Sequence, residues 1–280
     1  MVLCAHLSNA NKNARKDSEH PKEDLSYKGE SMEKFFIVCP FLFLSGFVDA
    51  IAGGGGLISF PAFVLAGVPV HIIIGTSKLG AFPGAIVAML RFAKSGFVKW
   101  KLAVPCGAAG FIGAIIGALV TLRLDESVVE SMMFIVLPVV AFYMFRNKNA
   151  VSDEVISSLS EKKILVFGIL ASLVIGAYNG FYGPGCGTFL LLAFTGLVKL
   201  NTKEAAGITK VVNLAADVGG LCAFASFGKV DIPLGIAAAV FCMLGSYFGS
   251  GMVVNNGQKI VRPVILVVLG LLFAKLILGF

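Results

Sequence analysis

The chain is an almost uninterrupted series of apolar segments. Most have about 17–23 residues, the length with which an α-helix crosses about 30 Å of hydrocarbon. Hydrophobic residues make up 57% of the 280 residues and charged residues 14%, against about 25% charged residues in soluble domains. The sequence therefore predicts an all-α polytopic membrane protein with about eight to ten membrane segments. The predicted segments are 35–52, 57–69, 73–93, 102–122, 128–145, 164–180, 187–198, 205–227, 232–253 and 263–279.

The two halves of the chain are homologous. Residues 75–100, "GTSKLGAFPGAIVAMLRFAKSGFVKW", align without gaps on residues 207–232, "GITKVVNLAADVGGLCAFASFGKVDI", so that Lys78 matches Lys210. Residues 46–56, "GFVDAIAGGGG", align on residues 176–186, "GAYNGFYGPGC", so that Asp49 matches Asn179. Lysines and glycines held in register over such a length indicate a duplication. We expect two transmembrane repeats, 32–146 and 164–280, joined by a cytoplasmic linker, 147–163.

The distribution of Lys and Arg favours inverted repeats, because cytoplasmic loops of membrane proteins are enriched in both residues. Residues 91–101 and 146–163 are basic, and residues 123–130 between them are mainly acidic. In the second half the bias reverses, since the loop 228–231 is poor in basic residues and 255–262 is rich in them. Both ends of the mature chain would then lie outside. A parallel arrangement stays open, because the boundaries within 35–69 are ambiguous.

The first 31 residues differ from the rest, being polar, mixed in charge and without an apolar signal-peptide core. Two interpretations stay open. In the first, translation starts at Met32, since "KGES" can be encoded by a bacterial ribosome-binding sequence. In the second, residues 1–31 form a disordered tail. The mass of the mature N-terminus distinguishes them.

Two glycine-rich motifs interrupt the apolar pattern: "GFVDAIAGGGGLISFP" from residue 46 and "GAYNGFYGPGCGTF" from residue 176. Glycine lowers helix stability by about 1 kcal/mol relative to alanine, and helices break inside a membrane only where the backbone lines a cavity or is buried in protein. We therefore predict broken or re-entrant helices at both motifs, each at the tip of a helical hairpin. Free N–H groups of the helix that follows, around Gly55 to Leu57, would face a small anion. The residues assigned to substrate binding here are Gly53, Gly54, Gly55, Gly56, Leu57, Ser59, Gly183, Gly185, Gly187 and Thr188.

An alternative is that glycines permit close helix packing, as small residues do in membranes. Packing explains the separate glycines of the later segments, but it explains a run of four glycines poorly. The glycines assigned to packing are Gly107, Gly110, Gly113, Gly117, Gly245 and Gly249.

Four ionisable residues fall within membrane segments, where charges are costly and usually face a cavity. Lys78 and Lys210, related by the repeat, would form a symmetric pair of ammonium groups for an anion, unless they extend to the membrane surface instead. Asp49 and Asp217 are candidates for proton coupling; Asp49 alternatively makes a helix-terminus hydrogen bond or an ion pair with Lys78. The neighbouring polar residues assigned to the substrate site are Ser77, Asn179, Thr209 and Asn213.

Several classes of site are not indicated. The six cysteines form no CxxC pair and the three histidines do not cluster, so neither a disulfide framework nor a metal site is expected, and no cofactor is assigned. The net charge of +7 lacks a dense basic cluster with interleaved aromatic residues, which argues against nucleic-acid binding. The expected partners are a small anion and the lipid bilayer, and a homo-oligomer stays open.

With these motifs, "GTSK" and "ITKVVN", the chain resembles the TauE/SafE family of membrane permeases, also called the sulfite exporter or TSUP family, over about residues 35–280. The resemblance implies a transporter in the bacterial cytoplasmic membrane for small sulfur-containing or organic anions. It names neither the anion nor the direction. The family is usually described with about eight spans, so ten segments require that the short ones be re-entrant or fused with a neighbour.

A secondary transporter with alternating access is the leading functional hypothesis. A passive anion channel would use the same glycine tips as a filter and would need no coupling carboxylate. An enzyme is disfavoured, because neither HExxH nor GxSxG occurs, and a membrane anchor would show no flux. We expect Lys78→Ala or Lys210→Ala to abolish transport while the protein still folds.

Overall fold

A computed structural model describes residues 31–129, 131–132 and 160–256, and these residues form α-helices and connecting turns. The compact unit discussed below begins at Val38. The expected all-α fold is confirmed. The helices are α3 (Ser31–Ala52), α4 (Gly56–Leu65), α5 (Val70–Lys94), α6 (Trp100–Thr121), α8 (Glu161–Phe181), α9 (Cys186–Gly196), α10 (Thr202–Ser226) and α11 (Ile232–Asn256).

The helices repeat in the order that the sequence predicts. Helices α3 to α6 correspond to α8 to α11, and α5 and α10 begin and end at positions exactly one repeat apart in the alignment. Within the described residues, five helices are long and apolar enough to cross a membrane: α5, α6, α8, α10 and most of α11. The expected polytopic membrane protein is thereby confirmed. Helices α4 and α9 have only 10 and 11 residues, about 15 Å of helix each, and are too short to span.

Each glycine-rich motif lies at the tip of a helical hairpin, as predicted. In the first hairpin, the Ser45 hydroxyl on α3 donates to the Gly55 carbonyl (2.8 Å), and Val48 packs against Ile58 on α4. In the second, the Tyr178 hydroxyl on α8 donates to the Pro184 carbonyl (2.7 Å), and its ring contacts Phe189 on α9. The helices within each hairpin therefore run antiparallel, and neither hairpin is one continuous spanning helix.

Glycines let two pairs of helices pack closely side by side. A Cβ on Gly113 or Gly117 of α6 would collide with carbonyl oxygens of α8, and a Cβ on Gly245 or Gly249 of α11 would collide with those of α3. The packing assigned to these four glycines is thus present. In the repeat, α6 corresponds to α11 and α8 corresponds to α3. The α6–α8 pair is therefore equivalent to the α11–α3 pair, and the packing follows the symmetry of the duplication.

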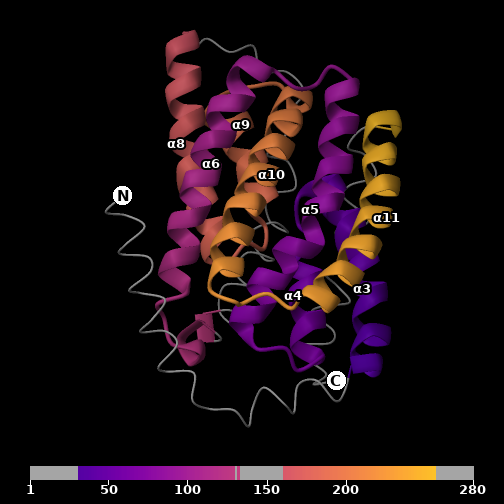
Figure 1. The fold of residues 1–280 in the computed structure, drawn as a ribbon. Coiled ribbons are helices and arrows are strands. Elements are labelled where there is room, and N and C mark those ends of the chain that lie inside the picture. Colours follow the sequence, from indigo (N-terminus) through magenta and orange to yellow (C-terminus); the bar gives the residue numbers. More distant parts are fainter. Residues whose placement is uncertain (1–30, 130, 133–159, 257–280) are drawn as a thin grey trace. The chain divides into compact units, whose positions relative to one another are not determined.

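The repeat-related helices α5 and α10 run antiparallel at the centre of the unit (Figure 1). Gly75, near the start of α5, lies against Phe224, near the end of α10, while Gly207, near the start of α10, lies against Phe97, just after α5. At one end of the pair a salt bridge joins Lys99 to Glu204 (2.7 Å). Each helix therefore begins where its repeat-related partner ends.

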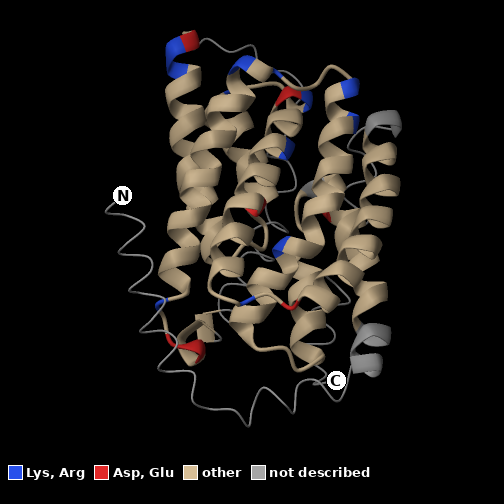
Figure 2. Ribbon diagram, viewed as in Figure 1, with Lys and Arg blue, Asp and Glu red and all other residues tan. Residues whose placement is uncertain are grey.

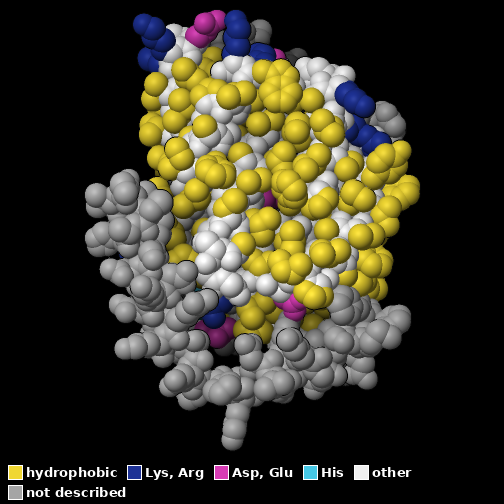
Figure 3. Space-filling model, in the orientation of Figure 1, with side chains coloured by type: hydrophobic (Ala, Val, Ile, Leu, Met, Phe, Trp, Pro, Cys, Tyr) yellow, Lys and Arg dark blue, Asp and Glu magenta, His cyan; other side chains and the backbone are white. Residues whose placement is uncertain are grey.

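Charged residues gather at the two ends of the helices, and few lie between these ends (Figure 2). Hydrophobic side chains cover most of the visible face between these ends (Figure 3). Large hydrophobic side chains that are exposed include Ile116 on α6, Val174 on α8 and Phe248 on α11. An apolar belt between charged ends is what a lipid bilayer requires.

Some predictions lie outside the described residues. They concern nearly all of the tail 1–31, of the segment 128–145 and of the linker 147–163, and the whole segment 263–279. The positions of both ends of the chain relative to the membrane belong to the same group.

Candidate functional site

The tips of the two hairpins meet each other. Gly53, Gly183 and Gly185 have φ values of 74°, 106° and 81°, which favour glycine because it lacks a Cβ. A Cβ on Gly53 would lie 2.5 Å from the Gly187 Cα, and a Cβ on Gly56 would lie 2.9 Å from the Pro184 Cα. The glycines therefore serve both purposes considered above, because they break the helices and they let the two breaks touch.

The expectation that backbone N–H groups from Gly55 to Leu57 are free is largely wrong. The Leu57 N–H donates to the Gly54 carbonyl (3.1 Å), and the Gly55 N–H points at Asp49 Oδ1 at 3.4 Å, a long and weak hydrogen bond. On the second tip the Cys186 N–H donates to the Gly183 carbonyl (3.1 Å). A carboxylate of the protein thus faces the N-terminus of α4, where a bound anion was expected, in agreement with the helix-terminus alternative for Asp49.

A cavity of about 60 Å³ lies where the tips meet. This space holds about four water molecules, at about 15 Å³ each. Both repeats line the cavity, and most of the predicted substrate-binding residues are among the lining. The predicted residues found there are Asp49, Gly53, Gly55, Gly56, Ser59, Ser77, Lys78, Asn179, Gly183, Gly185, Gly187, Asn213 and Asp217.

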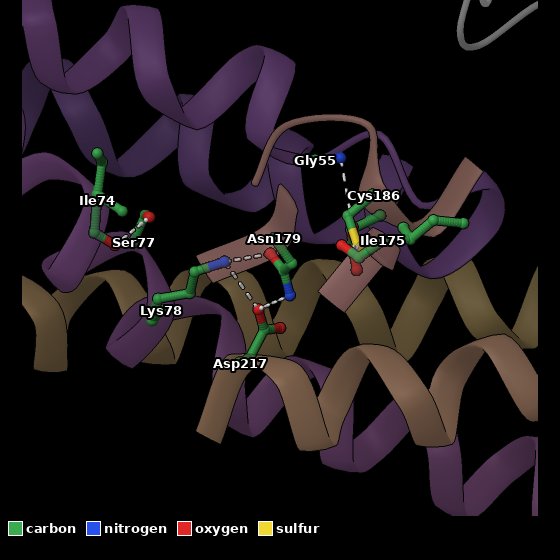
Figure 4. A network of polar contacts seen from close by, with 9 residues as sticks. Gly55, Ile74, Ser77, Lys78, Ile175, Asn179, Cys186 and Asp217 are labelled. Carbon is green, nitrogen blue, oxygen red and sulfur yellow. Dashed lines mark hydrogen bonds and ion pairs between the residues drawn. The ribbon is translucent and has the colours of Figure 1, made fainter. Parts of the chain in front are cut away.

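Lys78, Asn179 and Asp217 form a buried polar triad beside this cavity (Figure 4). They come from α5, α8 and α10 and are 4%, 2% and 4% exposed. The Lys78 ammonium forms an ion pair with Asp217 Oδ1 (3.2 Å) and donates to Asn179 Oδ1, while Asn179 Nδ2 donates to Asp217 Oδ1 (3.0 Å). The carboxylate partner of Lys78 is therefore Asp217 rather than Asp49.

Lys210 occupies the repeat-related position but has a different environment. It is 5% exposed, and its ammonium donates to the backbone carbonyl of Asp49, near the end of α3. A cation at a helix C-terminus is stabilised by the carbonyl dipoles there. Lys210 is not among the residues that line the cavity, so the two lysines do not form the expected symmetric pair. Neither side chain extends to the membrane surface, because both are buried.

Two polar side chains in the cavity wall make no hydrogen bond within the described part of the chain. Ser59 on α4 and Asn213 on α10 are 6% and 7% exposed, and both line the cavity. The fully enclosed side-chain atoms without a partner in the described residues are instead Ser172 Oγ and Thr209 Oγ1, so the polar atoms of Ser59 and Asn213 reach the cavity itself. The cavity therefore offers a hydroxyl and an amide that are available to a ligand.

A few predicted site residues lie outside the cavity wall, and some lining residues were not predicted. The predicted residues outside the lining are Gly54, Leu57, Thr188, Thr209 and Lys210. Among the residues missed are Ser45 and Ser246. Ser45 precedes Asp49 by one helical turn and shares its face, a spacing that the sequence contains. Ser246 has no such signal, because its repeat-related position is Ala114.

Interrupted helices from two repeats around a polar cavity are typical of secondary transporters. Within the described residues, no group of His, Cys, Asp and Glu has the arrangement of a metal site. The fold and the site together define a multi-pass membrane transport protein.

The comparisons agree with this class and specify the family. The model of the family described as "Sulfite exporter TauE/SafE" matches residues 38–276. The chain belongs to this family, and the resemblance seen in its motifs is thereby confirmed.

Relatives from several bacteria are named "Probable membrane transporter protein". One from Haemophilus influenzae is 31% identical over 240 residues, covering 84% of this chain and 91% of the relative. One from a Sinorhizobium species is 33% identical over 226 residues (81% and 85%), and YfcA of Escherichia coli is 32% identical over 259 residues (89% and 94%). No solved structure matched the chain. The family and these names are those of transporters and not of enzymes.

Proposed function

We propose that this protein is a secondary transporter that moves small anions, such as sulfite or small sulfonates, across the bacterial cytoplasmic membrane by alternating access. The observation that carries the proposal is the buried Lys78 ammonium in the wall of a polar cavity, at the point where two interrupted hairpins meet. An ammonium group held away from water binds an anion strongly, because solvent screens their attraction little there. The free side chains of Ser59 and Asn213 supply further hydrogen bonds.

The size of the cavity supports a small substrate. Space for about four water molecules suits a compact oxyanion rather than a metabolite with a long carbon chain. The match to the sulfite exporter family supports the same class of anion.

Alternating access is supported by the arrangement of the repeats, which we propose to be inverted. Helices α5 and α10 run antiparallel, and the first hairpin leads into the start of α5 while the second leads into the start of α10. The hairpins would then enter the membrane from opposite faces. The loops next to Lys99 and Lys203 share one end of the molecule, in agreement with a cytoplasmic position for basic loops.

Uptake of radiolabelled sulfite into proteoliposomes tests the proposed function. We expect saturable uptake by the wild type that is accelerated by unlabelled sulfite on the other side, because a carrier returns faster when loaded. A Lys78→Ala variant should lose this flux, and Lys162→Ala, at an exposed lysine on α8, should keep it. Flux that neither saturates nor shows this acceleration would indicate the channel alternative, and wild-type flux in Lys78→Ala would remove Lys78 from the site.

A further inference from the structure

The charged groups around the cavity balance each other. They are two cations, Lys78 and Lys210, and two carboxylates, Asp49 and Asp217, and each carboxylate interacts electrostatically with the lysines or with the other carboxylate. In their ordinary charge states the four groups sum to zero. A bound anion would add an uncompensated negative charge at a site shielded from water, which is costly. Anion binding therefore favours the simultaneous arrival of one positive charge.

Asp217 is the group that breaks the symmetry of the repeats. Its counterpart in the first repeat is Ala85, a buried apolar residue. Lys210 is held by a backbone carbonyl and makes no direct ion pair within the described residues, although Asp49 and Asp217 act on it at longer range. The ion pair between Lys78 and Asp217 therefore has no equivalent at the repeat-related positions Lys210 and Ala85. It places a carboxylate on the ammonium that the transported anion would use.

The hydrogen bonds of Asp217 leave one of its oxygens free. Lys78 and Asn179 both donate to Oδ1, and Oδ2 accepts no hydrogen bond within the described part of the chain. The titratable and charged groups that face Asp217 are Lys78 from α5 and Asp49 from α3, with the Cys186 thiol from α9 and Lys210 on α10 itself. From α8 the facing group is the neutral amide of Asn179. Among these groups, Asp217 alone is both a carboxylate and a direct partner of Lys78.

We propose that Asp217 competes with the transported anion for Lys78, and that it yields by binding a proton, so that each monovalent anion is transported together with one proton. This inference rests on the proposed function. An O–H bond forms at Oδ2 with a proton from the water on the side where the anion enters. Lys78 stays protonated and exchanges the carboxylate for the anion. The cluster gains one negative and one positive charge, remains neutral, and releases both on the other side.

Proton uptake on anion binding tests the inference without any need for transport. The full-length protein in detergent, in weakly buffered solution with a pH indicator, is titrated with methanesulfonate, which keeps its single negative charge at every pH used. We expect the wild type to take up about one proton per bound anion, and its affinity to fall about tenfold for each unit rise in pH, by proton linkage. Binding without proton uptake would overturn the proposal.

Matched variants identify the group that takes the proton. Asp217→Asn imitates the protonated carboxyl, so we expect the variant to bind methanesulfonate with no proton uptake and no dependence on pH. Asp125→Asn, at an exposed loop position, should behave as the wild type and take up about one proton per anion. Full proton uptake by Asp217→Asn would contradict the assignment.

Accumulation in proteoliposomes separates this inference from the proposed function. An imposed proton gradient should drive methanesulfonate or sulfite into wild-type vesicles against a concentration gradient, and an imposed sodium gradient should not. Saturable wild-type flux that responds to sodium alone, or to neither gradient, would sink the proton coupling while leaving the transporter in place. A wild type that neither binds nor moves either anion would instead overturn the proposed function.

Discussion

Lys78 and Lys210 occupy the same position in the two repeats, yet they serve different purposes in the structure. Lys210 stabilises the end of α3 through a backbone carbonyl, whereas Lys78 joins α5 to α8 and α10 through Asn179 and Asp217. The sequence could predict that both lysines lie within apolar segments, where they recur in register, but it left open whether they are buried or extend to the membrane surface. It could not predict their partners, since Asn179 and Asp217 are distant in sequence and approach Lys78 only when the helices pack.

The ion pair changes what is expected of Lys78 substitutions. Removing one partner of a buried pair leaves an uncompensated charge and costs about 3–5 kcal/mol. We therefore predict that Lys78→Met lowers the melting temperature in detergent as well as abolishing transport, contrary to the simple expectation that folding is unaffected.

A second substitution separates the two effects of Lys78→Met. The double variant Lys78→Met/Asp217→Asn carries no unpaired charge at the triad, so its melting temperature should return most of the way to that of the wild type while transport stays absent. A single variant as stable as the wild type would show that the pair is not buried as described.

At the scale of the elements, the two hairpins depend on glycine for two separate reasons that can be measured apart. Gly53 and Gly67 have similar φ values, 74° and 68°, but only Gly53 has another chain segment within reach of an added Cβ. A residue with a Cβ at such a φ is strained by about 1–2 kcal/mol. Only at Gly53 does contact with Gly187 add to this strain.

We predict that Gly67→Ala is tolerated with a small loss of thermal stability, of about 1–2 kcal/mol, and with transport retained. Gly53→Ala should cost clearly more and should abolish transport, because the tips must separate. Melting curves and sulfite uptake of the two variants, compared side by side, check this. Equal losses in both would mean that the contact between the tips has no importance.

The helices and their interruptions were predictable because the local signals for them are strong. Apolar segments of spanning length and the glycine motifs gave α5, α10 and the short α4 and α9 within four residues of their observed ends, somewhat more than the one or two residues by which assignment methods differ. The prediction of free N–H groups was largely wrong, because these groups donate hydrogen bonds to the Gly54 carbonyl and the Asp49 carboxylate nearby. Which acceptor lies about 3 Å from an N–H group depends on the backbone geometry of the turn. A run of glycines can adopt several such geometries, so the sequence does not determine the acceptor.

At the scale of the whole molecule, the account depends on the direction of the two repeats in the membrane. The antiparallel packing of α5 on α10 places the ends of these two helices at opposite ends of the unit. Lys94 and Ser226 are the last residues of α5 and α10, are related by the repeat, and are both exposed. They therefore provide a matched pair of positions for labelling.

We predict that Lys94→Cys and Ser226→Cys, each introduced into a protein without its six native cysteines, react with a membrane-impermeant thiol reagent from opposite sides. Lys94→Cys should be labelled only from the cytoplasmic side, since its loop is basic. Labelling of both positions from the same side in intact cells and inverted vesicles would refute inverted repeats.

The central claim is that a small oxyanion binds at Lys78 in the cavity between the two hairpin tips. The most direct measurement is an experimental structure of the full chain with selenite, a heavier analogue of sulfite whose selenium is located by anomalous scattering. The account predicts a selenium position inside the cavity, with oxygens within hydrogen-bonding distance of Lys78 Nζ and of Ser59 or Asn213. A cavity that stays free of selenium while the ion binds elsewhere, or while the protein still transports it, would contradict the account.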